Sequence, residues 1–154
     1  AWLAPETRVL NEAAMLDVIR SDRFADGSRW DPAVTALIES PLSEEVRQGA
    51  TGEARITRYE PNRIDVSTNA GGPSILVLSE NHYPGWRTYL DGRAVETLRV
   101  DYNLRGVPLP AGQHLVEFIY RPKSVLIGMA ISLFAIALLS AGTVIDRKYK
   151  NLRL

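Results

Sequence analysis

The sequence contains no cysteine and only two histidines, and its 18 basic residues balance its 18 acidic ones. The lack of cysteine excludes disulfide bonds and thiolate metal sites. His82 and His114 are too far apart for an HxH or HExxH pattern, so we expect no metal site. There is also no phosphate-binding GxxxxGK sequence and no GxSxG sequence, so no cofactor and no catalytic residue is predicted. Zero net charge gives no reason to expect a nucleic-acid partner.

The most informative segment is Ser124–Ile145, which has no charged residue, proline or histidine. As a helix it would be about 33 Å long, against a bilayer hydrocarbon core of about 30 Å. A buried helix or an oligomer core is the alternative, but such helices usually keep a polar face, and this segment has none. The segment therefore predicts one C-terminal transmembrane helix, with the lipid bilayer as its partner.

Basic residues on either side of this segment predict its orientation. The tail 146–154 carries Arg147, Lys148, Lys150 and Arg153 against one acidic residue, and fewer basic residues precede the segment. Basic loops favour the cytoplasmic side, so we expect a cytoplasmic C-terminus and a soluble domain outside the membrane. The sequence shows neither an initiator methionine nor a signal peptide to export that domain. We therefore expect a C-terminal part of a longer protein, with earlier membrane helices as partners of the last one.

The first part of the chain, 1–39, predicts a small strand–helix–strand unit. Thr7–Leu10 is a short strand-like run, and Asn11 is suited to cap a helix. Apolar residues then recur at helical spacing, and Val34–Ile38 reads as a second strand. The polar stretch 40–52 is predicted to be a linker.

Residues 53–123 predict an antiparallel β-sandwich, Ig-like or jelly-roll-like. Apolar residues alternate with polar ones, and turn residues recur at intervals typical of this class. Pro84-Gly85 suits a type II turn, and Asp91-Gly92 suits a two-residue hairpin. Ser74–Leu78 is apolar on both faces, which predicts a central strand. Seven strands are predicted: Ala54–Tyr59, Arg63–Thr68, Ser74–Ser79, Trp86–Leu90, Ala94–Val100, Leu104–Leu109 and His114–Tyr120.

Several short patterns in this region resemble a known family when they are taken in order. They are Tyr83-Pro84-Gly85-Trp86, Asp91-Gly92, Arg105–Val107, Pro110-Ala111-Gly112-x-His114 and Phe118-x-Tyr120-x-Pro122 leading into the apolar helix. In this order and spacing, the sequence resembles the C-terminal end of the bacterial YfhO-like membrane proteins. The resemblance covers most of the chain.

The resemblance implies a parent protein similar to GT-C glycosyltransferases, which use lipid-linked sugar donors at the outer face of the bacterial cell membrane. In that fold the catalytic acidic residues lie on early loops between N-terminal membrane helices, and none of these loops is present in this sequence. Whether the parent is an enzyme is left open by these residues. We expect a non-catalytic accessory domain plus the last transmembrane helix of a protein that glycosylates the cell envelope. The alternative is a membrane-anchored carbohydrate-binding or adhesion module.

An anchored hydrolase is a third interpretation, because a glycosidase needs two facing carboxylates. Glu80, Asp91 and Asp101 lie near predicted strand ends, where ordinary turn chemistry explains them equally well.

Three further groups of residues have both a functional and a structural interpretation. An aromatic group is either a sugar-stacking surface or part of the core, with the core favoured. An arginine group either contacts lipid head groups or lies on a solvated face, with the solvated face favoured. A stripe of small residues on the apolar helix favours packing against other helices. The aromatic group consists of Tyr83, Trp86, Tyr89 and Tyr102. The arginine group consists of Arg87, Arg93, Arg99 and Arg105. The stripe of small residues consists of Gly128, Ser132 and Ala135.

Overall fold

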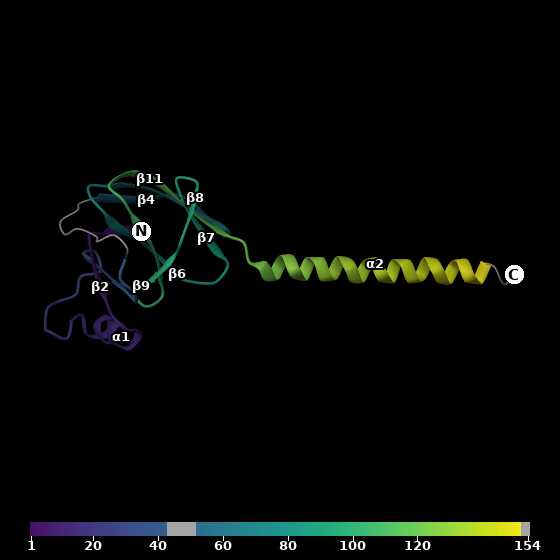
Figure 1. Cartoon of the computed structure of the whole chain (residues 1–154), viewed down its shortest axis with the longest axis horizontal. Helices are drawn as coiled ribbons and strands as arrows, with labels where there is room; N and C mark the ends of the chain where they lie inside the picture. Colours follow the sequence, from purple (N-terminus) through teal and green to yellow (C-terminus); the bar gives the residue numbers. More distant parts are fainter. Residues whose placement is uncertain (43–51, 152–154) are drawn as a thin grey trace. The chain divides into compact units, whose positions relative to one another are not determined.

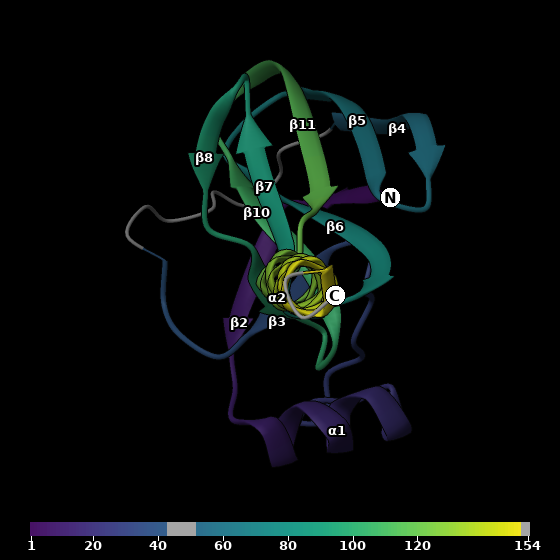
Figure 2. The ribbon, with the colours of Figure 1, turned by 90° about the vertical axis from the view of Figure 1, so that its right-hand side faces the viewer.

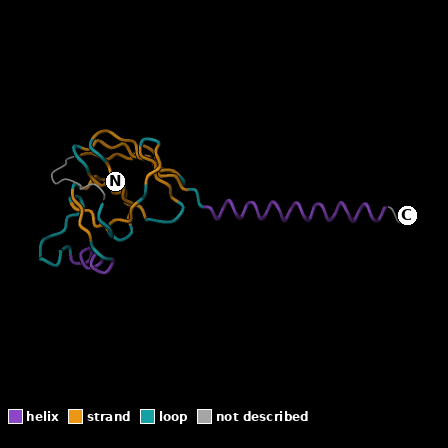
Figure 3. Tube along the Cα trace, in the orientation of Figure 1, coloured by secondary structure: helices purple, strands orange, loops and turns teal. Residues whose placement is uncertain are grey.

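Two compact units, Ala1–Arg121 and Pro122–Leu154, make up the chain in a computed structural model that describes residues 1–42 and 52–151. The first unit is built from strands and one short helix, and the second is a single long helix (Figures 1 and 3). The predicted mainly β fold with one C-terminal apolar helix is therefore confirmed. Most of the predicted linker 40–52 lies outside the described residues.

The first unit contains two sheets. The six-stranded sheet has the order β1 (Trp2–Ala4), β6 (Ser74–Asn81), β10 (Leu104–Leu109), β9 (Leu98–Val100), β3 (Thr35–Ile38), β2 (Glu6–Val9). The five-stranded sheet has the order β4 (Gly52–Glu60), β5 (Arg63–Ala70), β11 (Gly112–Tyr120), β7 (Trp86–Leu90), β8 (Arg93–Val95). All neighbouring strands are antiparallel except β2 and β3.

The N-terminal strand–helix–strand unit forms as predicted. Helix α1 (Glu12–Ser21) begins after Asn11, whose side-chain oxygen accepts a hydrogen bond from the Ala14 backbone N–H at 2.9 Å. The helix connects the parallel strands β2 and β3 and lies beside them at one end of the six-stranded sheet (Figure 2). These two strands extend the larger sheet and do not form a sheet of their own. The predicted unit is thus part of the sandwich's architecture.

The main core lies between the two sheets. Residues Ser74–Leu78 of β6 are all buried, which confirms the prediction of a central strand. Leu76 and Leu78 contribute to the core cluster that also contains Phe118 of the facing sheet. Ile75 and Val77, on the opposite face of β6, belong to a second cluster, and the residues of α1 form part of a third. The six-stranded sheet is therefore buried on both faces, as its two-sided apolar strand requires.

The prediction of a single strand over Ala94–Val100 is wrong, because this segment forms two strands that belong to different sheets. β8 lies at the edge of the five-stranded sheet, and β9 pairs with β10 in the other. Thr97, between them, places its hydroxyl 2.5 Å from that of Thr88, which is buried. A strand that passes from one sheet of a sandwich to the other has to bend. The apolar positions shift from residue 95 to residues 98 and 100, so the alternation changes phase by one residue at the bend, and the prediction of one continuous strand missed that shift.

The second unit is helix α2 (Lys123–Asn151). Its segment Lys123–Gly142 has a mean hydropathy of 2.4 and is long and apolar enough to cross a membrane. None of this segment is buried within the described chain. The helix continues beyond the predicted span to Asn151 and so includes Arg147, Lys148 and Lys150. An apolar helix with no protein around it requires another apolar environment, either a bilayer or other helices.

Candidate functional site

Four side chains form a continuous stack at one end of the sandwich, which we call the arginine–aromatic stack: Arg105, Trp86, Tyr120 and Tyr83. The Arg105 guanidinium carbon lies 3.9 Å from the centre of the Trp86 ring. The Trp86 and Tyr120 ring centres are 5.3 Å apart, and those of Tyr120 and Tyr83 are 6.5 Å apart. The stack thus links β10 of one sheet to β7 and β11 of the other.

The strand pairing of the five-stranded sheet places the aromatic residues together. Trp86 begins β7 and is the direct cross-strand partner of Tyr120, the last residue of β11. Residues directly opposite each other in an antiparallel pair have adjacent side chains. Gly85, just before β7, has a φ of 107°, as expected for the second central residue of the predicted turn, and Tyr83 lies in that turn. The Tyr-Pro-Gly-Trp pattern therefore supplies Tyr83 and Trp86, two of the three rings of the stack.

Arg105 is the buried end of the stack, with only 3% of its surface exposed. Its Nε donates a hydrogen bond to the Asn81 backbone oxygen at 2.9 Å, while its Nη1 has no hydrogen-bond partner among the described residues. Burial lowers the pKa of Arg105, and the nearby Glu80 carboxylate opposes that shift. The flat guanidinium is stabilised in this position by the face of the Trp86 ring.

The prediction that Arg105 lies on a lipid-facing or solvated surface is therefore wrong. Its side chain points between the sheets, on the same face of β10 as the buried Val107 and Leu109. Successive side chains of a strand alternate between faces, so residues 105, 107 and 109 share one face. Applying that alternation strictly to the sequence would have predicted a buried arginine.

The other three arginines lie in different surroundings. Arg87 and Arg93 are exposed. Arg99 forms ion pairs with Glu39 and, at 3.7 Å, with Glu12. A lipid contact by Arg87, Arg93 or Arg99 remains a prediction, and Arg99 is already neutralised by two acidic partners.

The four aromatic residues predicted to contact a glycan do not form one surface. Trp86 is half-buried against the main core, and one of its ring faces is covered by Arg105. Tyr89 pairs with Glu117 across the strands and faces away from Trp86, because it lies three residues further along β7. Tyr102 lies in the turn between β9 and β10, with its ring centre 5.9 Å from the Arg99 guanidinium. The core interpretation fits Trp86 best.

Asp91 links the β7–β8 hairpin to β11. Its Oδ1 accepts a hydrogen bond from the Leu115 backbone N–H at 2.9 Å, and its Oδ2 lies 2.7 Å from His114 Nδ1. The hydrogen bond from the Leu115 backbone N–H lowers the pKa of Asp91 most, and the bond with His114 lowers it further. Asp91 and Gly92 have φ values of 49° and 79°, as the predicted two-residue hairpin requires. The Asp-Gly and Gly-x-His patterns of the sequence thus meet in one structural contact.

Asp101 links the β9–β10 turn to β3. Its Oδ1 accepts a hydrogen bond from the Leu37 backbone N–H at 2.8 Å, and its own N–H donates to the Leu37 oxygen at 2.9 Å. Burial raises the pKa of Asp101 to about 6, although the bond from Leu37 acts in the opposite direction. Its Oδ2 is buried and has no hydrogen-bond partner among the described residues.

The third acidic residue, Glu80, accepts a hydrogen bond from the Tyr59 hydroxyl, which raises the pKa of Tyr59. Glu80, Asp91 and Asp101 each bind a different part of the domain. Among the described residues, no group of three or more His, Asp or Glu side chains is placed to hold a metal ion.

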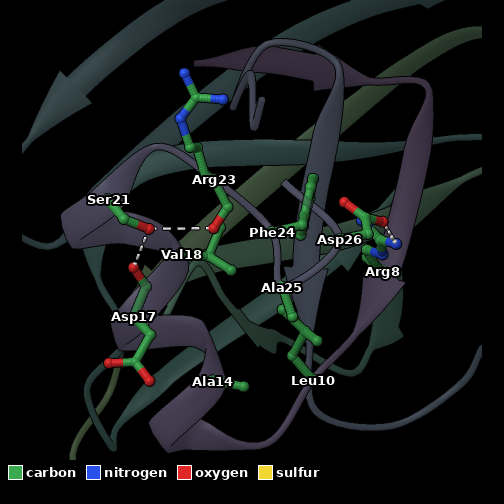
Figure 4. A pocket seen from close by; sticks show the side chains of 10 residues that line it. All are labelled: Arg8, Leu10, Ala14, Asp17, Val18, Ser21, Arg23, Phe24, Ala25 and Asp26. Atoms are coloured by element: carbon green, nitrogen blue, oxygen red, sulfur yellow. Dashed lines mark hydrogen bonds and ion pairs between the residues drawn. The ribbon is translucent and has the colours of Figure 1, made fainter. Parts of the chain in front are cut away.

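A pocket of about 480 Å³ lies beside α1 (Figure 4). Arg8 lines it, stacks its guanidinium 4.0 Å from the centre of the Phe24 ring and donates a hydrogen bond to Asp26 at 2.8 Å. The Ser28 hydroxyl and then Arg8 hold the pKa of Asp26 far below its usual range. Arg8 and Asp26 bind each other and neighbouring groups of the chain. We therefore interpret them as structural residues at the α1 end of the domain.

Comparison with known families decides the identity of the chain. Residues 30–132 match the family of the bacterial membrane protein YfhO. The chain belongs to the YfhO family. No curated protein matches it, and no solved structure matches it. The match covers β3 to β11 and enters α2, so it includes the arginine–aromatic stack and both aspartate links.

Membership of a membrane-protein family agrees with the apolar helix and supports membrane association of the chain. The small-residue stripe of α2 is exposed. A Cβ at Gly128 would meet nothing within 4 Å, and the Ser132 hydroxyl donates to the Gly128 oxygen at 2.9 Å. Ala135 lies one turn further on. This face is open to another helix, whose presence stays a prediction.

Proposed function

We propose that this YfhO-family chain is the non-catalytic extracytoplasmic domain and last transmembrane helix of a polytopic glycosyltransferase-like protein. The whole protein would transfer a sugar from a lipid-linked donor during cell-envelope glycosylation. Its catalytic acidic residues would lie on other loops, as the family resemblance implies. The domain would cover those loops or shape the access of donor and acceptor.

The observation that carries the proposal is the structural use of the three acidic residues that lie near predicted strand ends. Asp91 and Asp101 each accept a hydrogen bond from a backbone N–H, and Glu80 accepts a hydrogen bond from the Tyr59 hydroxyl. A glycosidase needs two carboxylates that face each other across a sugar ring, one of them free to donate a proton. Carboxylates bound to three different parts of the sandwich do not support that chemistry, whereas they do support a fixed shape.

The connection to the helix supports a covering role. The backbone N–H of Tyr120 donates to the Asn62 oxygen at 2.9 Å, and that of Arg121 donates to the Gly85 oxygen at 2.8 Å. The chain is therefore held by two turns of the domain up to the residue before Pro122. If α2 spans the membrane, so short a connection would keep the domain near the membrane surface, where a lipid-linked donor would be presented.

The alternative of a carbohydrate-binding or adhesion module has less support. Sugar-binding surfaces use free aromatic faces, and Trp86 has one face stacked on Arg105. In the described part of the chain, the ring contacts of Trp86 include neither Tyr89 nor Tyr102.

The experiment is a sugar-transfer assay on the complete membrane protein in vesicles that contain a lipid-linked sugar. Glu80→Gln, Asp91→Asn and Asp101→Asn are compared with substitution of the first acidic residue on the first outer loop. We expect transfer within about threefold of wild type for the three domain variants, and loss of transfer for the loop variant. Loss of transfer of 100-fold or more in a domain variant that still folds, as shown by a cooperative melt, would contradict a non-catalytic domain.

A further inference from the structure

We propose that Tyr83, the exposed end of the arginine–aromatic stack, inserts into the lipid head-group layer of the membrane, with the half-buried rings of Tyr120 and Trp86 behind it. This surface would anchor the sandwich at a fixed depth. The proposal needs only that α2 spans a membrane, so it is independent of the proposed sugar transfer.

The first argument is the length of chain between the stack and the span. Tyr120 is three residues before Lys123, where the apolar segment of α2 begins. Three extended residues cover at most about 11 Å, whatever the orientation of the domain. The head-group layer on each side of the hydrocarbon core is about 5 to 8 Å thick. Tyr120 therefore lies within or just above that layer whenever α2 is in the membrane.

The second argument is that the other two rings are fixed beside Tyr120. Their centres are 5.3 Å (Trp86) and 6.5 Å (Tyr83) from that of Tyr120. The hydrogen bond from Arg121 to Gly85 also holds the Tyr83 turn against the last residue of the domain. The three rings therefore lie together beside the point where the chain leaves the domain, and the proposal places Tyr83 at the head-group layer with Tyr120.

The third argument is the chemistry of this surface. Tyr83 is 61% exposed, so its ring is free to contact lipid. Tyrosine and tryptophan are enriched at membrane interfaces, where the ring contacts acyl chains and the polar atom stays hydrated. Arg121 and Lys123 are exposed next to the rings in sequence, where lipid phosphates would be. The buried Arg105 fixes Trp86 from behind, so the rings form a rigid surface.

This chain has no cysteine, so the proposal can be tested with single introduced cysteines once any cysteines elsewhere in the whole protein have been replaced. Tyr83→Cys and Asn62→Cys would each carry an environment-sensitive fluorophore, in the full protein reconstituted into phosphatidylcholine–phosphatidylglycerol vesicles. Asn62 keeps all three rings, and its backbone oxygen already binds the Tyr120 N–H. Arg93→Cys is the control, because the exposed Arg93 pairs with Leu90 at the opposite end of β7, about 14 Å along the strand from Trp86.

We expect lipids with a head-group spin label to quench the labels at positions 83 and 62 at least about twofold more than the label at 93. Iodide in the water should show the reverse order. Equal quenching at all three sites would overturn the proposal. Protection of position 83 from both quenchers would also overturn it, because the stack would then contact another protein segment. If Tyr83→Cys fails to fold, position 62 decides alone.

Discussion

Asp101→Asn is expected to stabilise the domain at neutral pH. Asp101 is 8% exposed and its backbone φ is 47°, a left-handed conformation that asparagine adopts readily. An asparagine side chain keeps an oxygen to accept the hydrogen bond from Leu37. It removes the negative charge that burial makes unfavourable. The substitution therefore separates the cost of the charge from the benefit of the bond.

The magnitude follows from the pKa, which rises from 3.8 to about 6 on folding. Each unit corresponds to about 1.4 kcal/mol, so the folded state is penalised by about 3 kcal/mol when Asp101 is ionised. A raised carboxyl pKa means that the folded state binds the proton more tightly. Its stabilising effect is full below about pH 4 and is lost as the pH rises through 6. Asp101→Asn should thus gain up to about 3 kcal/mol at pH 7 and less than about 1 kcal/mol at pH 4.

The assay is urea unfolding of the full chain in detergent micelles at pH 4, 5, 6 and 7, followed by tryptophan fluorescence. Asp91→Asn is the matched control, because the pKa of Asp91 is lowered and the sign reverses. That variant should lose stability at every pH of the assay, because the loss disappears only as the pH falls through the lowered pKa, below 3.8. A loss of stability at pH 7 in Asp101→Asn, or an equal gain at pH 4 and pH 7, would refute the reasoning.

Three other variants test packing. Gly106→Ala would place a Cβ 2.4 Å from Val100 Cγ1. The free energy of unfolding should therefore fall by about 1 to 3 kcal/mol in the same urea assay. A second substitution, Val100→Ala, should recover part of that lost stability. Arg105→Lys should lose the flat contact with Trp86 and about 1 to 2 kcal/mol, with altered near-ultraviolet circular dichroism; unchanged signals would count against the stack. Gly128→Leu should reduce cross-linking of α2 to neighbouring helices in membranes, whereas equal cross-linking would argue against the stripe.

Much of the β-sandwich follows from the sequence because its signals are local. Strands β4 to β7, β10 and β11 were predicted within a few residues, since their alternation of side chains is bounded by turn residues. The helix cap at Asn11 and the hairpin at Asp91-Gly92 follow from the chemistry of single residues. The apolar segment of α2 is equally local, because length and composition define it.

The features that the sequence did not predict depend on distant partners. β1 has only three residues and exists because it pairs with β6, more than 70 positions away. The division of 94–100 into β8 and β9 depends on which sheet each half joins. The burial of Arg105 requires Trp86 from the opposite sheet, and the aromatic neighbour of Trp86 is Tyr120, which was not among the predicted site residues. Pairing across the sandwich, more than composition, creates the stack.

The most direct test of the central claim is the side of the membrane on which the domain lies. Single cysteines at Arg93, in an exposed hairpin, and at Leu154, the last residue, would be treated in intact bacteria with a maleimide that does not cross membranes. We predict labelling of Arg93→Cys in intact cells and of Leu154→Cys only after the membrane is permeabilised. Labelling of position 154 in intact cells with protection of position 93 would place the domain in the cytoplasm and contradict the proposed function.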